Sequence, residues 1–102
     1  MRKFETLLLI SPEIPVEARE ATLEKIKELI ERSEGQVAEV DIWGMRDLAY
    51  PVRKLQRGYY VRFEYTGPGA IVAELERNLR ITEGLLKFLT VRLDEQVEGG
   101  VN

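Results

Sequence analysis

Residues 44–65, GMRDLAYPVRKLQRGYYVRFEY, contain the clearest strand pattern and the densest positive charge of the chain. Between residues 59 and 65, apolar or aromatic side chains at the odd positions alternate with Tyr, Arg and Glu at the even positions, which is the period of two of a β-strand. Pro51 lacks the N–H that an interior strand donates, so the first half of the stretch belongs to an edge strand and its turn. The stretch therefore predicts a long β-hairpin with a basic tip.

The composition of the chain argues against catalytic activity and metal binding. Its 102 residues are enough for one domain with one core. The sequence has no cysteine and no histidine, so it lacks thiolate ligands, the commonest general base and the commonest metal ligand. It also has no Gly-rich phosphate loop, zinc-protease motif or nucleophile elbow. We therefore expect no enzymatic activity, no cofactor and no small-molecule substrate.

The net charge of -3 conceals an asymmetry along the chain. Residues 1–41 contain 6 basic and 10 acidic side chains, residues 42–92 contain 9 and 5, and residues 93–102 contain 3 acidic ones. A local cationic region attracts polyanions even when the whole protein is acidic. No apolar run is long enough for a signal peptide or a membrane span, so we expect a cytoplasmic protein with no membrane partner.

Further strands and helices are predicted on both sides of the hairpin. The pattern predicts strands over 2–10, 36–47, 59–65 and 85–93, and helices over about 15–33 and 70–79. Pro15 suits the first helical position, and Gly35 suits a left-handed cap at the end of that helix. A change of parity between Val37 and Val40, followed by Gly44, predicts a bulge in the second strand.

The order β-α-β-β-α-β predicts an α+β, ferredoxin-like fold, in which a four-stranded antiparallel sheet has both helices on one face. We expect a single domain over residues 1–94 and a flexible acidic tail over residues 95–102.

The first and last strands are apolar on both faces, although the helices can cover only one face of the sheet. In the last strand, parity places Leu85 on the same face as Leu89 and Val91. We expect Leu7, Leu9, Leu89 and Val91 to remain on the open face. Scattered surface leucines are ordinary, but four on adjacent strands favour a patch that binds a partner.

Residues 57–63, RGYYVRF, come close to the signature of an RNA-recognition motif, in which strand aromatics stack on bases. The small residue between the first two aromatics is missing, so we expect Tyr59 and Phe63 to face the helices as core. A free-standing module that binds single-stranded RNA is the alternative function. An enzyme resembling acylphosphatase is disfavoured, because residues 11–13 offer a proline and an acid where an anion needs backbone N–H donors.

The sequence GMRDLAYPVRK at residues 44–54, followed by GYY at 58–60, resembles the signature of the bacterial small-subunit ribosomal protein S-six (S6) family. The resemblance extends over nearly the whole chain, including the opening MRKFE and the helix end ELERNLRI at residues 74–81. Val52 stands where isoleucine is common, and the tail lacks the terminal glutamate run of some members. The resemblance implies a ferredoxin-like fold without enzymatic activity, located in the ribosome. It also implies binding to the central domain of small-subunit ribosomal RNA as a heterodimer with the basic ribosomal protein S-eighteen (S18).

Two sets of residues follow from the hairpin and from the open face. The expected RNA contacts are basic: Arg2, Arg46, Arg53, Lys54, Arg80, Lys87 and Arg92. The residues expected to dock the protein partner are apolar or aromatic: Leu7, Leu9, Trp43, Tyr60, Leu89 and Val91. We expect no catalytic or metal-binding residue. An acidic chain with one cationic hairpin and an apolar open face needs a basic co-binder.

Overall fold

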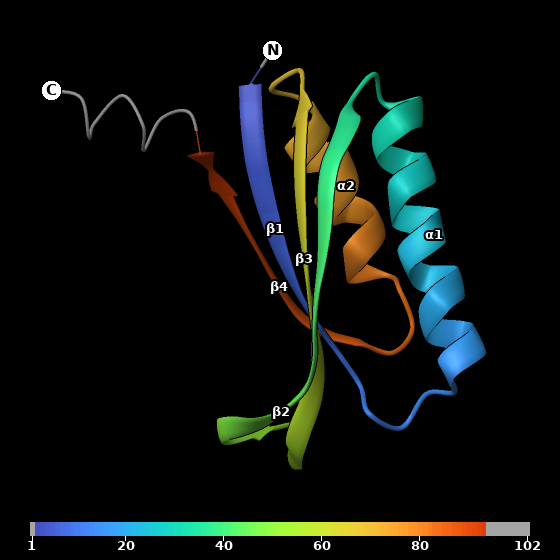
Figure 1. Ribbon diagram of the computed structural model, residues 1–102, viewed down its shortest axis with the longest axis vertical. Coiled ribbons are helices and arrows are strands. Elements are labelled where there is room, and N and C mark those ends of the chain that lie inside the picture. Colours follow the sequence, from blue (N-terminus) through green and yellow to red (C-terminus); the bar gives the residue numbers. More distant parts are fainter. Residues whose placement is uncertain (1, 94–102) are drawn as a thin grey trace, which may run out of the picture.

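The computed structural model describes residues 2–93, which fold into one antiparallel sheet with both helices on the same face (Figure 1). In chain order the elements are β1 (Arg2–Ile10), α1 (Val16–Arg32), β2 (Gln36–Val52), β3 (Leu55–Gly67), α2 (Ile71–Arg80) and β4 (Leu85–Arg92). The strand order across the sheet is β2-β3-β1-β4, with all neighbours antiparallel. The predicted α+β, ferredoxin-like fold is confirmed. The predicted tail, residues 95–102, lies outside the described residues.

The core lies between the sheet and the helices. The buried face of α2 consists of Ile71, Leu75 and Leu79, spaced four residues apart so that they stack on one side of the helix. Phe63 is fully buried in this layer, and Tyr59 packs against it with its ring 3.7 Å from the Arg19 guanidinium of α1. Both aromatics therefore face the helices, as predicted, and the exposed stacking platform of an RNA-recognition motif is not formed.

A chain of three hydroxyl groups crosses the core side of the sheet. The Tyr65 hydroxyl on β3 lies 2.8 Å from Thr6 Oγ1 on β1, which lies 2.8 Å from Thr90 Oγ1 on β4. Tyr65 and Thr6 are both buried, and burial raises the pKa of the Tyr65 phenol above its ordinary value. Each hydroxyl of the chain thus has a hydrogen-bonding partner inside an otherwise apolar layer.

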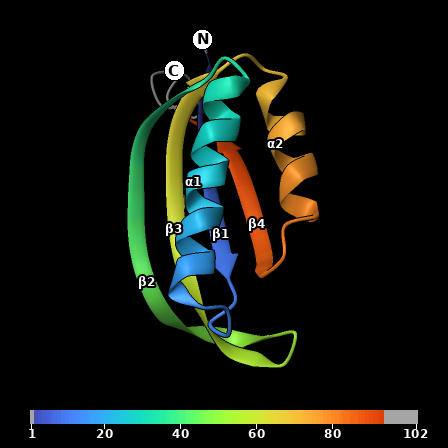
Figure 2. The same ribbon diagram turned by 90° about the vertical axis from the view of Figure 1, so that its right-hand side faces the viewer.

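The hairpin of β2 and β3 extends past the end of β1, where Ile10 is paired with Tyr59. The predicted bulge between Val37 and Val40 is confirmed by a register shift between Val37 and Glu39, and a second shift precedes Gly44 (φ +86°). Strand β2 is one strand at the edge of the sheet from Gln36 to Val52, so the predicted second strand and the edge strand expected before the turn are continuous. Figure 2 shows the tip of the hairpin bending across, below the start of β4, and Figure 1 shows that it bends toward the side of the sheet away from the helices.

The turn at the tip contains Arg53 (φ +50°) and Lys54 (φ +67°), between the paired residues Val52 and Leu55. A two-residue hairpin turn with both central φ angles positive matches the right-handed twist of the strands, and Asn-Gly is its usual sequence. Two long cationic side chains occupy left-handed positions here without a glycine to relieve the backbone.

The predicted cap of α1 was wrong by one residue. Glu34, not Gly35, has the left-handed backbone (φ +67°), and its N–H donates to Glu31 O. The N–H of Gly35 donates to Ile30 O at 2.8 Å, which completes a Schellman motif. Gly35 is needed for space, because a Cβ there would lie 2.5 Å from Ile71 Cδ1. The predicted start of α1 was also wrong by one residue, because Pro15 has an extended ψ of 156° and is the N-cap residue that precedes Val16.

The predicted face of Leu85 was also wrong. Leu9 pairs with Lys87 and Ile10 pairs with Leu85, so the register shifts by one residue between them. This irregularity reverses the parity, and Leu85 is buried in the core while Leu89 lies on the opposite face.

Candidate RNA and protein interfaces

The seven basic residues expected to contact RNA lie near two opposite ends of the sheet. At one end, Arg2 is paired with Gly67, and its guanidinium packs against Gly69 before α2. Arg92 lies near this end, paired with Phe4 on the helix face. The other five lie where the hairpin leaves the body of the sheet: Arg46, Arg53, Lys54, Arg80 and Lys87.

Three of these five line one hollow of about 280 Å³ beside the start of β4. They are Arg53 from the hairpin tip, Arg80 from the end of α2 and Lys87 from β4. Lys87 Nζ donates to the Tyr50 hydroxyl at 3.3 Å and lies 5.4 Å from the centre of that ring, so the hairpin is held against β4. These residues are far apart in the chain, and only the bend of the hairpin brings them together.

The remaining hairpin cations are oriented differently. Arg46 Nε donates to Trp43 O at 3.3 Å, and its guanidinium lies 5.9 Å from the Trp43 ring. Arg57 donates to Asp47 Oδ1 at 3.0 Å across the hairpin. Arg46 therefore borders the open face of the sheet, and Arg57 is neutralised within the hairpin.

The open face of the sheet contains an apolar patch on adjacent strands. Leu89 on β4 is 62% exposed and is paired with Leu7 on β1. Trp43 is 39% exposed, and its ring lies 6.0 Å from that of Tyr60. Val91 follows Leu89 on the same face of β4 and is half-buried.

Leu9 lies on this face but is only 3% exposed. Its side chain lies over Gly58, which has no side chain to hold it away from the sheet. Leu9 therefore supports the patch from beneath and presents little surface of its own.

An ionic network borders the apolar patch. Arg62, whose side chain is 18% exposed, donates through Nε to Glu5 and through Nη2 to Glu64 Oε1 at 2.7 Å. A third carboxylate, that of Glu39, lies 3.8 Å from Nη1. The hydrogen bonds that Arg62 donates to Glu5 and, with a smaller effect, to Glu64 raise the pKa of Arg62 further above its already high ordinary value. With three carboxylates around one guanidinium, the network itself carries a net negative charge.

Sequence reasoning did not predict this network. The signal was present in the strand parity, because Arg62 and Glu64 occupy alternate positions of β3 and Glu5 is paired with Glu64 on β1. Without the strand order, however, no pattern along the chain joins Glu5 to Arg62.

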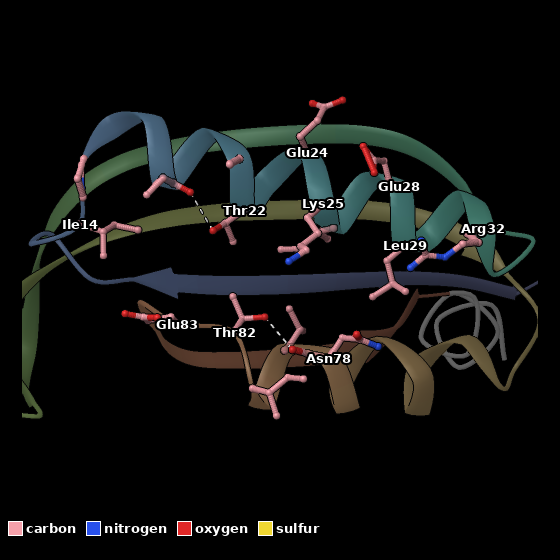
Figure 3. A pocket seen from close by; sticks show the side chains of 16 residues that line it. Ile14, Thr22, Glu24, Lys25, Glu28, Leu29, Arg32, Asn78, Thr82 and Glu83 are labelled. Carbon is pink, nitrogen blue, oxygen red and sulfur yellow. Dashed lines mark hydrogen bonds between the residues drawn. The ribbon is translucent and has the colours of Figure 1, made fainter.

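The other face of the molecule has an open groove of about 1000 Å³ between α1 and α2 (Figure 3). The hydroxyl of Thr22 donates to Ala18 O at 3.0 Å, and that of Thr82 donates to Asn78 O at 2.7 Å, so both are used within their own helical turns. Among residues 2–93 no group of three or more acidic side chains could hold a metal ion. In the same range, no helix is long and apolar enough to cross a membrane.

Known proteins match this chain in both sequence and structure. The family profile described as Ribosomal protein S6 matches residues 3–92. The small ribosomal subunit protein bS6 of Desulfovibrio desulfuricans is 61% identical over 101 residues, which covers 99% of each chain. The protein of the same name in Nitratidesulfovibrio vulgaris is 62% identical over 98 residues, covering 96% of this chain and 97% of its own.

The crystal structure of 30S ribosomal protein S6 from Thermotoga maritima matches with a TM-score of 0.88 at 30% sequence identity, covering 99% of this chain and 98% of the other. The match covers nearly the whole of both chains, so it includes the hairpin and the open face of the sheet. The chain therefore belongs to the ribosomal protein S6 family, and it is a structural, non-enzymatic protein of the bacterial small ribosomal subunit.

Proposed function

We propose that this chain binds the central domain of small-subunit ribosomal RNA together with ribosomal protein S18, using two separate surfaces. The observation that carries the proposal is the separation of charge. Five cations lie around the hairpin end, whereas Glu5, Glu39 and Glu64 border the apolar open face. The first surface suits phosphates, and the second suits a protein that is basic and also has apolar side chains to bury.

On the protein side, Leu89, Val91, Leu7, Trp43 and Tyr60 form the docking surface, with Leu9 beneath them. Leu89 and Trp43 are the most exposed of these side chains. Large aromatic and aliphatic side chains at the centre of a contact contribute most of its binding energy, while surrounding charges set the choice of partner. The excess of carboxylates beside the patch therefore selects a basic partner.

On the RNA side, Arg46, Arg53, Lys54, Arg80 and Lys87 contact the phosphate backbone. Arg2 and Arg92, at the other end of the sheet, form a second contact region. The net charge of -3 weakens RNA binding by the isolated chain, and a basic partner compensates for it.

The docking surface is tested with Leu89→Asp and with Val16→Asp as the matched control, because Val16 is 51% exposed but lies in the first turn of α1, on the opposite face of the sheet. Both variants should keep their stability to within about 0.5 kcal/mol. Leu89→Asp should weaken binding to purified S18 at least about a hundredfold in calorimetric titration, because it places a carboxylate in an apolar contact. Equal binding by the two variants would contradict the assignment of this face.

The RNA contact is tested by gel shift on a fragment of the central domain. The chain alone should bind weakly, and addition of S18 should increase the affinity strongly. Tight binding by the chain alone, lost in Tyr59→Ala, would instead favour the single-stranded RNA module.

A further inference from the structure

We propose that Arg53, Arg80 and Lys87 hold one backbone phosphate of the RNA between them, and that this phosphate fastens the hairpin tip to α2 and β4. The inference rests on the proposed RNA-binding function and adds that three cationic side chains share a single phosphate. The three side chains come from three different elements and line the same hollow. Its volume of about 280 Å³ lies just below the range of small-molecule pockets, so it suits a phosphate with its water rather than a whole ligand.

The charge in the hollow is largely uncompensated. Among the ion pairs of residues 2–93, none includes Arg53 or Lys87, and Arg80 has only a distant partner, Glu76 at 3.7 Å. Arg80 also ends α2, where the helix carbonyls repel an anion. More than one cation is therefore needed to hold a phosphate there, and the hairpin tip and β4 supply the other two.

The surroundings of the hollow strengthen this arrangement. Leu79, Leu85 and Phe88 also line it, so its floor rests on the apolar core and its cations stand at the rim. Guanidinium groups bind phosphate oxygens in a bidentate manner, while a lysine acts as a point charge. Two arginines and a lysine in one hollow can therefore satisfy several oxygens of a single phosphate.

The backbone of the tip supports a role for its side chain. Arg53 has φ +50° in a turn that Asn-Gly would form with less strain, yet a long cation occupies the position. The contact between Lys87 Nζ and the Tyr50 hydroxyl already places the hairpin against β4 in the free protein. The hollow is thus formed before RNA binds, so fewer side chains have to be ordered when the phosphate binds and the entropy cost of binding is lower.

The experiment measures binding of the full chain to small ribosomal subunits that lack this protein and retain S18, at several KCl concentrations and constant Mg²⁺. The variants are Arg53→Gln, Arg80→Gln, Lys87→Gln, their pairs and the triple substitution. Each single variant should bind about tenfold more weakly. If one phosphate is shared, the triple variant should bind only slightly more weakly than the pairs. Its salt slope should then be smaller in magnitude by about 0.7–0.9, the value for one phosphate.

Arg77→Gln and Arg57→Gln are the matched controls, because both are basic neighbours engaged elsewhere, with Glu74 at 2.8 Å and Asp47 at 3.0 Å. Both should bind within about twofold of the unaltered chain. Additive losses with a slope change of about two or more would mean separate phosphates and would overturn the inference, as would unchanged binding in the single variants. Failure of the unaltered chain to bind at all would refute the proposed function instead.

Discussion

Replacing Arg62 with methionine should destabilise the protein by about 2–3 kcal/mol. The guanidinium donates to Glu5 and, at 2.7 Å, to Glu64, and a hydrogen bond to a charged group contributes about 1.5–3 kcal/mol. Water can solvate part of the abandoned carboxylates, because the Glu5 and Glu64 side chains are 29% and 24% exposed, so the lower end of that range applies to each bond. Methionine keeps the unbranched aliphatic part of the arginine side chain, so the loss of stability measures the contribution of the charged guanidinium group.

Urea unfolding followed by circular dichroism measures this loss, with the midpoint falling and the m-value unchanged. The melting temperature should fall by roughly 10–20 °C. Arg57→Met is the control, because the Arg57–Asp47 pair is exposed and should contribute less than about 1 kcal/mol. In Glu5→Gln/Arg62→Met, removal of an abandoned carboxylate should restore about 1 kcal/mol. A loss below about 0.5 kcal/mol for Arg62→Met would refute the account of this network.

Four further predictions concern the backbone and the core. Glu34→Gly should raise the free energy of unfolding by about 0.5–1 kcal/mol in urea titration, because it relieves a left-handed glutamate at the helix end. Arg53→Asn/Lys54→Gly should add about 1–2 kcal/mol by relaxing the tip, while weakening association with small subunits in sedimentation. Gly58→Ala should cost about 1–3 kcal/mol in thermal unfolding, since the new methyl group meets a buried leucine. Burial raises the pKa of Tyr65, so the contribution of its neutral hydroxyl to stability is complete below pH 10 and is lost as the pH rises above that. Tyr65→Phe should lower the free energy of unfolding by about 1 kcal/mol at pH 7. In a series of urea titrations at increasing pH, the variant should also lose less stability above pH 10 than the unaltered chain does.

The fold could be predicted because its signals are local. Alternation along β3 placed Phe63 in the core, and the breaker residues around Pro15 and Gly67 separated the elements. The errors arose where tertiary packing decides the detail. The glycine at residue 35 is required by the limited space beside Ile71, whereas the left-handed backbone lies at Glu34. No sequence pattern marks the irregularity in β4 that buried Leu85.

The candidate surfaces were predictable only as lists of residues. Parity correctly placed Leu89 opposite the helices, but the burial of Leu9 depends on a glycine in a neighbouring strand. The hollow between Arg53, Arg80 and Lys87 depends on the bend of the hairpin, which is a property of the twisted sheet. Residue type and order contain no measure of that bend.

The three hydroxyls that cross the core side of the sheet also protect the chain from misfolding. A slip of one position in β1 would turn Thr6 toward solvent and leave the Tyr65 hydroxyl stranded in hydrocarbon, at a cost of about 1–3 kcal/mol beyond the lost apolar packing. Because the Thr6 hydroxyl is hydrogen-bonded to side chains on β3 and β4, a register shift of β1 against either strand breaks one of these hydrogen bonds. During folding, the hydrogen bonds of Thr6 therefore favour the native register of β1 with both β3 and β4 over registers shifted by one residue.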